Sequence, residues 1–336
     1  MILVTGGTGL LGSHLLLELV REHEEVVAVK RASSDMEEVK RVFARHSGEA
    51  EALFKLIDWV DIDLANQADV EGAMTDIDQV YHCAAMVSFN PGDANQMIDF
   101  NVTSTENIVN ACLATGVKRL VHVSSSSAIG RSPEGEPADE TMIWARSKKH
   151  TAYSVSKFKS EMEVWRGMEE GLEAVIVNPT IIIGAGFWNN GSSAMFSRVA
   201  KGLRFGTPGM TGYVGVQDVV SAMTRLMASD ISGERFILSA GDHTYAEILK
   251  MIAGALGVPR KMKLVTPSML HALSRMDALK GFLTGKRSLT LEQVKAAFNR
   301  AGFSSNKVRE AIGFEFTPVH EVIQRVAEFY RADHPK

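Results

Sequence analysis

The first half of the chain alternates short apolar runs with segments in which apolar residues recur every three or four positions. The apolar runs are continuous, which is typical of parallel strands buried on both faces. They predict strands at Ile2–Thr5, Val26–Lys30, Leu56–Ile62, Gln79–Cys83, Leu120–Ser124 and Ala174–Asn178, with a seventh at Arg235–Ser239. The periodic segments predict helices at Leu10–Glu22, Met36–Arg45, Asp69–Met74, Ala94–Ala114 and Tyr153–Glu170. This repetition predicts an α/β fold with a doubly wound parallel sheet.

The pattern changes after Asn178. A glycine- and aromatic-containing loop is expected at Gly184–Gly191, a short strand at Tyr213–Val216 and a helix at Asp218–Ala228. From Thr244 the chain is predicted to be mostly helical, with helices over 245–256, 289–301 and 318–331. We therefore predict a sheet domain of residues 1–178 and 213–242, and a smaller, mostly helical substrate domain of residues 179–212 and 243–336.

Composition narrows the class of protein. The 336 residues carry a formal charge of −4, and 45% are hydrophobic and 23% charged, which excludes a disordered chain and a strongly basic nucleic-acid binder. Two cysteines, Cys83 and Cys112, exclude a disulfide framework and favour the cytoplasm. Residues 1–20 are apolar, but no Lys or Arg precedes them and glycines interrupt them, so a strand is expected there instead of a membrane segment. The histidines lack metal-ligand spacing, so no metal is expected.

A glycine-rich motif connects the first predicted strand to the first predicted helix. It reads Thr5-Gly6-Gly7-Thr8-Gly9-Leu10-Leu11-Gly12. In this context Gly6 permits a sharp turn, Gly9 lets the backbone approach a pyrophosphate, and Gly12 lets the helix lie close to the strand. The phosphates would then lie at the positive end of the helix. The motif predicts a dinucleotide-binding site of the Rossmann type; the alternative is a glycine-rich turn without a ligand.

The end of the second predicted strand indicates which dinucleotide binds. Proteins that prefer NAD usually carry an acidic residue there for the ribose 2′-hydroxyl, but this chain has Lys30 and Arg31, followed by Ser33 and Ser34. Cations pair with a 2′-phosphate, and arginine does so through two N–H groups at once. We therefore expect the protein to bind NADP(H). The alternatives are that it binds NAD(H), or that the two cations are only a solvated strand end.

A second group of residues has the spacing of an acid–base site. Tyr153 and Lys157 are four residues apart on a predicted helix and so share one face. A neighbouring ammonium is expected to lower the tyrosine pKa, so that the phenol exchanges protons with an alcohol near neutral pH. The serine cluster Ser124–Ser127 ends a predicted strand and offers a hydroxyl for the substrate oxygen. The alternatives are a surface tyrosine and a serine-rich turn.

Together these segments resemble an extended short-chain dehydrogenase/reductase over nearly the whole chain. The further matches are the adenine-contacting pair Asp63-Leu64, the cofactor-side motif His82-Cys83-Ala84-Ala85, the structural asparagine Asn101, and a PTxxxG segment formed by Pro179, Thr180, Ile182 and Gly184, which passes the nicotinamide in the family. The resemblance implies that Ser125, Tyr153 and Lys157 are catalytic. It also implies that Asn101 holds a water or a helix kink that relays protons to Lys157. Cys83 is interpreted as a small buried hydrophobe.

The subgroup of the family is indicated by a departure from its pattern. The nucleotide-sugar epimerases and dehydratases usually carry an arginine before a Val-x-Asp motif, and Thr211–Asp218 lacks it. The chain is more similar to the dihydroflavonol reductase and 3β-hydroxysteroid dehydrogenase-like group, which implies reduction of a ketone or aldehyde with NADPH by hydride transfer. Two alternatives stay open, an NAD-dependent nucleotide-sugar epimerase or dehydratase and a non-catalytic NADP(H)-sensing protein.

Several residues near these segments are candidates for substrate contact. They are Met86, Ser88, Phe89, Ser126, Asn178, Phe187 and Trp188, with Trp144 nearby. For the large apolar side chains the alternative is core packing, and for Asn178 it is a structural bond at the strand end. The basic run Arg146–His150 either attracts an anionic substrate or forms a solvated helix entrance. A homodimer through the helices at Ala94–Ala114 and Tyr153–Glu170 is implied by the family alone.

Overall fold

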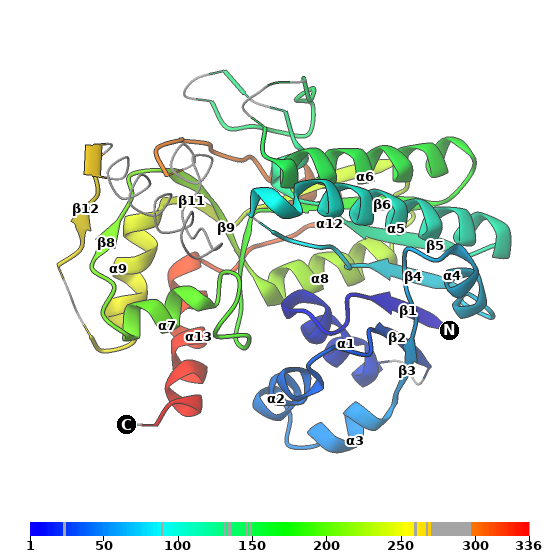
Figure 1. The fold of residues 1–336 in the computed structure, drawn as a ribbon, viewed down its shortest axis with the longest axis horizontal. Helices are drawn as coiled ribbons and strands as arrows, with labels where there is room; N and C mark the ends of the chain where they lie inside the picture. Colours follow the sequence, from blue (N-terminus) through cyan, green and yellow to red (C-terminus); the bar gives the residue numbers. More distant parts are fainter. Residues whose placement is uncertain are drawn as a thin grey trace.

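A seven-stranded parallel sheet forms the centre of the larger part of the molecule (Figure 1). The computed structural model describes residues 1–22, 25–88, 90–130, 132–133, 136–145, 147, 150–258, 261–266, 268–269 and 297–335. The strands are β1 (Ile2–Thr5), β2 (Val26–Lys30), β3 (Ile57–Asp61), β4 (Gln79–His82), β5 (Arg119–Val123), β6 (Ala174–Pro179) and β10 (Glu234–Leu238). Their spatial order is β10-β6-β5-β4-β1-β2-β3.

Helices cover both faces of this sheet, as the continuous apolar strands require. Neighbouring strand residues point to opposite faces, so Val4 of β1 packs into one core and Leu3 into the other. One face is covered by α1 (Leu10–Glu22), α2 (Met36–His46), α3 (Ala50–Lys55) and α8 (Val216–Met227). The other face is covered by α4 (Gln67–Ala73), α5 (Ala94–Thr115) and α6 (Ala152–Glu169). The expected doubly wound Rossmann fold is confirmed.

The strand order reverses between β1 and β4, and ligands of such sheets bind outside the carboxyl ends of the strands at this point. The loops that leave those ends include the glycine motif after β1 and the segment after β4. The serine cluster follows β5 and contains the short 3₁₀ helix η2 (Ser126–Ala128). Another 3₁₀ helix, η1 (Pro91–Asp93), precedes α5. The topology therefore brings the predicted site segments to one edge of the sheet.

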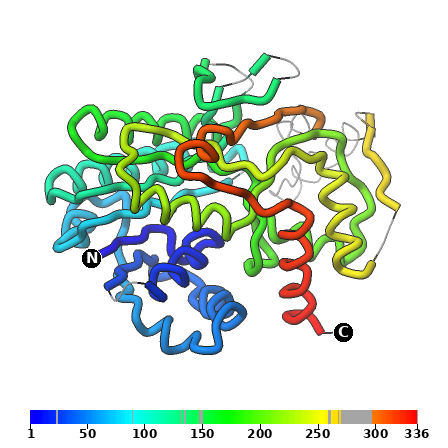
Figure 2. The backbone as a smooth tube through the Cα atoms, turned by 180° about the vertical axis from the view of Figure 1, so that it is seen from behind, coloured from blue at the N-terminus to red at the C-terminus, as the bar shows by residue number. Residues whose placement is uncertain are grey.

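The remaining elements pack around a separate apolar core. A three-stranded sheet consists of β7 (Ile181–Ile183), β9 (Met210–Gly215) and β11 (Gly241–Thr244), and a two-stranded one of β8 (Phe205–Gly206) and β12 (Lys263–Leu264). The helices are α7 (Ala194–Ala200), α9 (Tyr245–Ala255), α12 (Asn306–Ile312) and α13 (Val319–Asp333). Figure 2 shows α13, in red, descending beside this part. Among the described helices, none is both long and apolar enough to cross a membrane.

Two strands show clear differences between the predicted and the observed elements. The strand expected from Leu56 begins at Ile57, because Leu56 ends the unpredicted helix α3. The strand expected at Tyr213–Val216 begins three residues earlier and ends at Gly215, where α8 begins. It also pairs with β7 and β11 instead of joining the main sheet. The domain boundaries stay a prediction.

The helix expected over 289–301 lies largely outside the described residues, and its described end is not helical. There the backbone pairs with the start of β9: Met210 N donates to Asn299 O at 2.9 Å, and Ala301 N donates to Met210 O at 3.0 Å. These bonds use the groups that a helix would need for its own ladder. The expectation is therefore wrong for residues 297–301.

Candidate active site

The glycine motif forms a tight turn between β1 and α1. Gly6 has φ +71°, and a Cβ there would lie 2.6 Å from Ala84 N. A Cβ on Gly12 would lie 2.2 Å from Gly6 O, so the first turn of α1 packs directly on the loop. That turn carries no acidic side chain, and an anion at the helix N-terminus meets no like charge from it. The loop therefore fits a dinucleotide phosphate.

The two cations at the end of β2 are placed differently. Lys30 Nζ lies 3.4 Å from Asp61 Oδ2, across the paired ends of β2 and β3. Arg31 is exposed, and its backbone N–H donates to Ser34 Oγ at 3.0 Å. The Ser34 hydroxyl also lies 3.4 Å from Thr8 Oγ1, which brings this loop beside the glycine motif. Arg31 is thus better placed than Lys30 to meet an additional negative charge.

The segments expected to line the cofactor have structural partners of their own. Leu64 is buried in the core, and its carbonyl accepts from Asn107 Nδ2 at 2.9 Å. Asp63 Oδ1 accepts from Ala65 N at 3.0 Å. Thr180 Oγ1 donates to Leu238 O at 3.1 Å, which links the residue after Pro179 to β10. Contact with a cofactor stays a prediction for these residues.

A buried chain of hydrogen bonds connects the glycine motif to α5 through His82. Thr5 Oγ1 lies 2.7 Å from His82 Nδ1 and accepts from Ala84 N at 3.2 Å. His82 Nε2 lies 3.1 Å from Thr105 Oγ1, whose hydroxyl donates to Asn101 O at 2.8 Å. Because the Thr105 hydroxyl donates its proton to Asn101 O, it accepts a hydrogen bond from His82 Nε2, and the imidazole proton is therefore assigned to Nε2. Burial lowers the pKa of His82 to about 3, so it is a neutral link that fixes Ala84 beside the loop.

Tyr153, Lys157 and Ser125 meet at the expected edge of the sheet. Thr151 caps α6 by accepting from Ser154 N at 3.0 Å, which fixes the start of the helix beside the serine cluster. The Tyr153 hydroxyl is hydrogen-bonded to the Ser125 side chain. Lys157 Nζ donates to Val123 O at 2.9 Å, at the end of β5. An acid–base pair and a hydroxyl therefore share one site.

Burial controls the protonation of this group. It raises the pKa of Tyr153, and the bond from Ser125 opposes this only in part. It lowers the pKa of Lys157 to about 8. The expected lowering of the tyrosine pKa is therefore wrong for the chain itself, because desolvation of the phenolate is the largest influence on it. Tyr153 is kept as a phenol, the form that donates a proton.

Asn101 connects three segments of the structure through hydrogen bonds. Its Oδ1 accepts from Met86 N at 2.7 Å, and its Nδ2 donates to Met86 O and to Ser156 Oγ, both at 3.0 Å. Its carbonyl accepts from Ser160 Oγ at 2.9 Å, as well as from Thr105. Asn101 thus joins α5 to α6 and to the loop after β4. A relay role toward Lys157 stays a prediction.

A carboxylate that the sequence pattern did not indicate lies beneath the site. Glu161 is fully buried and accepts hydrogen bonds from Asn178 Nδ2 and Arg235, the latter at 3.4 Å. Asn178 Nδ2 also donates to Ser125 O at 3.0 Å, so it ties the strand end to the serine loop. The signal available in the sequence was position alone, since Glu161 follows Lys157 by four residues.

The candidate substrate residues fall into two groups. Met86 is held by Asn101, Ser88 Oγ donates to Asp93 Oδ2 at 2.7 Å, and Ser126 begins η2 beside Ser125. Phe89 lies outside the described residues. Most of the basic run lies outside them too. His150 Nε2 lies 2.9 Å from Ala145 O, and its ring stacks on Trp144, which favours the structural interpretation of that part.

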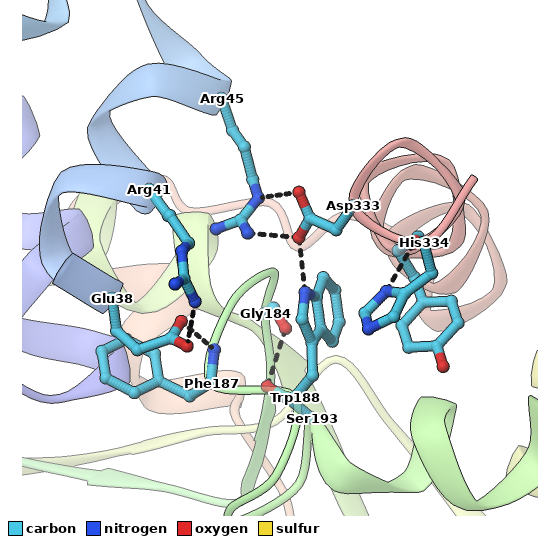
Figure 3. A network of polar contacts seen from close by, with 10 residues as sticks. Glu38, Arg41, Arg45, Gly184, Phe187, Trp188, Ser193, Asp333 and His334 are labelled. Carbon is cyan, nitrogen blue, oxygen red and sulfur yellow. Dashed lines mark hydrogen bonds and ion pairs between the residues drawn. The ribbon is translucent and has the colours of Figure 1, made fainter.

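Phe187 and Trp188 have their contacts with α2 and α13 (Figure 3). The Trp188 indole donates to Asp333, which also accepts from Arg45 Nε at 3.0 Å. The Phe187 N–H donates to Glu38 Oε2 at 3.4 Å, and its backbone is left-handed, with φ +55°. The structure thus brings these two residues to a junction between α2 and α13.

Two neighbouring cavities lie on the sheet face that carries α1 and α8, opposite α6. One of about 320 Å³ is lined by residues of α1 and α8 with His14 and His46, and one of about 310 Å³ by residues of α8 and α13 with His46. Of the candidate substrate residues that the structure describes, none lines either cavity.

The sheet order, the glycine turn and the Ser125–Tyr153–Lys157 group together define a nucleotide-binding protein of the extended short-chain dehydrogenase/reductase class. The model of the NAD dependent epimerase/dehydratase family matches residues 2–239, and the chain belongs to this family. The family binds a nicotinamide dinucleotide, and its members include NAD(P)-dependent oxidoreductases.

The proteins that are similar to this chain are named for different activities. Sterol demethylase protein B of Methylococcus capsulatus is 30% identical over 277 residues, 81% of this chain and 79% of that protein. The bifunctional dihydroflavonol 4-reductase/flavanone 4-reductase of Pyrus communis is 26% identical over 333 residues, 94% and 86% of the two chains. UDP-glucose 4-epimerase of Thermotoga maritima, solved with UDP-glucose, has a TM-score of 0.78 at 20% identity and 99% coverage of both chains. The similarity to this epimerase shows that the two chains share a fold.

Proposed function

We propose that the protein reduces a ketone or aldehyde to an alcohol with NADP(H). The observation that carries the proposal is the meeting of Ser125, Tyr153 and Lys157 at the carboxyl edge of the sheet. The bound nicotinamide supplies the hydride. The protein orients the carbonyl and supplies the proton.

Each residue of the group has one task. Ser125 and Tyr153 donate hydrogen bonds to the carbonyl oxygen, where negative charge develops. Tyr153 then gives its proton to that oxygen. A raised tyrosine pKa suits this direction, because a reduction needs the phenol and an oxidation needs the phenolate. Lys157 would hold the nicotinamide ribose hydroxyls, and it is mostly charged at pH 7, below its pKa of about 8.

The choice of NADP(H) rests on the loop after β2. Arg31 is exposed there, and the hydroxyl of Ser34 lies beside Thr8 of the glycine motif. A guanidinium with neighbouring hydroxyls suits a 2′-phosphate, whereas a ribose hydroxyl is usually bound by an acid at this position. Gly6 to Gly12 would hold the pyrophosphate. The reductase names among the relatives support the same activity.

The experiment measures NADPH oxidation with a panel of ketones and aldehydes that includes flat ring ketones. Wild type is expected to turn over at least one of them, and Tyr153→Phe to lose about 100-fold or more of kcat while still binding NADPH. Full activity of Tyr153→Phe, or no turnover on any carbonyl, would refute the proposal. Conversion of a nucleotide sugar without net oxidation of NADPH would favour the epimerase alternative.

A further inference from the structure

Glu161 belongs to a buried hydrogen-bond network that reaches the Ser125 loop of the candidate active site. It follows Tyr153 by eight residues and Lys157 by four on α6, so all three share one helix face. Its side chain is fully buried. A carboxylate is rarely buried without partners, and here Asn178 of β6 and Arg235 of β10 supply them.

Those partners connect Glu161 to the serine loop. Asn178 Nδ2 donates a hydrogen bond to Glu161 Oε1 and also donates to Ser125 O at 3.0 Å. Arg235 lies 3.4 Å from Oε2. The same guanidinium donates to Glu140 O at 2.8 Å, so β10 anchors the network from behind. Burial raises the pKa of Glu161, and the bonds from these donors act in the opposite direction.

Lys157 and Glu161 lie one turn apart on α6, and Cys83 and then Glu161 act against burial by raising the pKa of Lys157. Among the described residues, the titratable groups that act on Lys157 or are acted on by it are His82 and Cys83 at the end of β4, His122 on β5, and Glu161 on its own helix, with Tyr153 one turn away. Burial keeps His82 and His122 neutral and raises the pKa of the Cys83 thiol to about 12. Of these groups, Glu161 is the one paired with a guanidinium as a carboxylate.

We propose that Glu161 is a positioning residue of this site, whose carboxylate holds the Ser125 loop through Asn178 and keeps Lys157 in its charged form. The inference rests on the proposed function for its catalytic consequence. The coupling between Glu161 and Lys157 is independent of which carbonyl is reduced.

The test compares Glu161→Gln with wild type in two pH series. One follows the affinity for NADPH, or for NADH if that is the dinucleotide bound, by fluorescence; the other follows kcat/KM on the best carbonyl. Removing the negative charge lowers the pKa of Lys157 further below its ordinary value. Both alkaline midpoints are therefore expected to move to lower pH, by about 1 unit.

Two further variants separate charge from geometry. Glu163→Gln, on the same helix but in a partly exposed pair with Arg166, is expected to match wild type. Asn178→Ala keeps the charge of Glu161 and cuts its link to Ser125 O, so kcat should fall about tenfold or more at an unchanged midpoint. Asn178→Ala also tests the inference if Glu161→Gln does not fold. An unchanged kcat in Asn178→Ala would contradict the role of Asn178 in linking Glu161 to the Ser125 loop.

The outcomes distinguish this inference from the proposed function. A midpoint in Glu161→Gln equal to that of wild type overturns the inference even if the enzyme reduces carbonyls well. A shifted binding midpoint with no turnover on any carbonyl supports the coupling and refutes the reductase. A fall in melting temperature with unchanged midpoints assigns Glu161 to the core alone and also overturns the inference.

Discussion

At the scale of the residue, burial acts on Tyr153 and Lys157 in opposite senses. It favours the neutral form of each, raising the pKa of the phenol and lowering that of the ammonium to about 8. The spacing of the two residues was visible in the sequence, but this direction was not, because desolvation depends on the segments packed around α6. The placement of Lys30 and Arg31 was likewise not visible in the sequence. The two residues are adjacent, but Lys30 is paired with Asp61 and Arg31 is exposed.

The different placement of these two cations gives a prediction about the cofactor. Arg31→Ala is expected to raise KM for NADPH about 10- to 100-fold and leave KM for NADH nearly unchanged, because only NADPH carries the 2′-phosphate. Lys30→Ala should have a smaller effect, since Lys30 is already paired with Asp61. Steady-state kinetics with both dinucleotides measure this. Equal changes for NADPH and NADH would contradict the assignment.

A second prediction concerns Gly12. In Gly12→Ala the new Cβ would meet Gly6 O at 2.2 Å, so the glycine loop must shift, and we expect NADPH affinity to fall at least about tenfold. Gly254→Ala is the matched control, because that helical position has open space and alanine favours a helix by about 1 kcal/mol. Titration of NADPH fluorescence compares the two. Normal affinity in Gly12→Ala would show that the loop does not hold the dinucleotide.

At the scale of the element, periodicity was a good guide wherever burial is continuous. The seven parallel strands were predicted within one or two residues, because their apolar runs are bounded by polar turns. It failed where backbone groups bond to distant partners, as at 297–301, which pairs with Met210. It also missed α3, because six residues without a fully buried side chain are too short to show a helical period.

The junction between α2 and α13 supplies a prediction at this scale. Asp333 accepts from Arg45 and from the Trp188 indole, and the side chain of Arg45 is only 8% exposed. Asp333→Ala leaves that guanidinium buried and unpaired, a cost of about 1–3 kcal/mol, which corresponds to a melting temperature lower by about 2–5 °C.

Differential scanning fluorimetry of Asp333→Ala tests this junction. Glu37→Ala is the control, because Glu37 forms an exposed pair with Lys40 and such pairs contribute little to stability. A melting temperature of Asp333→Ala equal to that of Glu37→Ala would show that the contact in Figure 3 contributes nothing to stability.

At the scale of the whole molecule, the sequence predicted the fold, the glycine turn and the Tyr153–Lys157 pair. It did not predict the contacts that assemble them. Glu161 and Arg235 are 74 residues apart, and Arg45 and Asp333 are 288 apart, so no local pattern relates the partners. Chain topology, with β10 returning beside β6, brings the first pair together.

The central claim, net reduction of a carbonyl, is tested most directly by following the hydride. NADPH deuterated at C4, prepared separately on each face of the ring, is incubated with the protein and its best carbonyl substrate, and the alcohol is examined by mass spectrometry. The account predicts an alcohol one mass unit heavier from one of the two labelled forms, with stoichiometric oxidation of NADPH. An unlabelled product from both forms, or product formed without oxidation of NADPH, would contradict it.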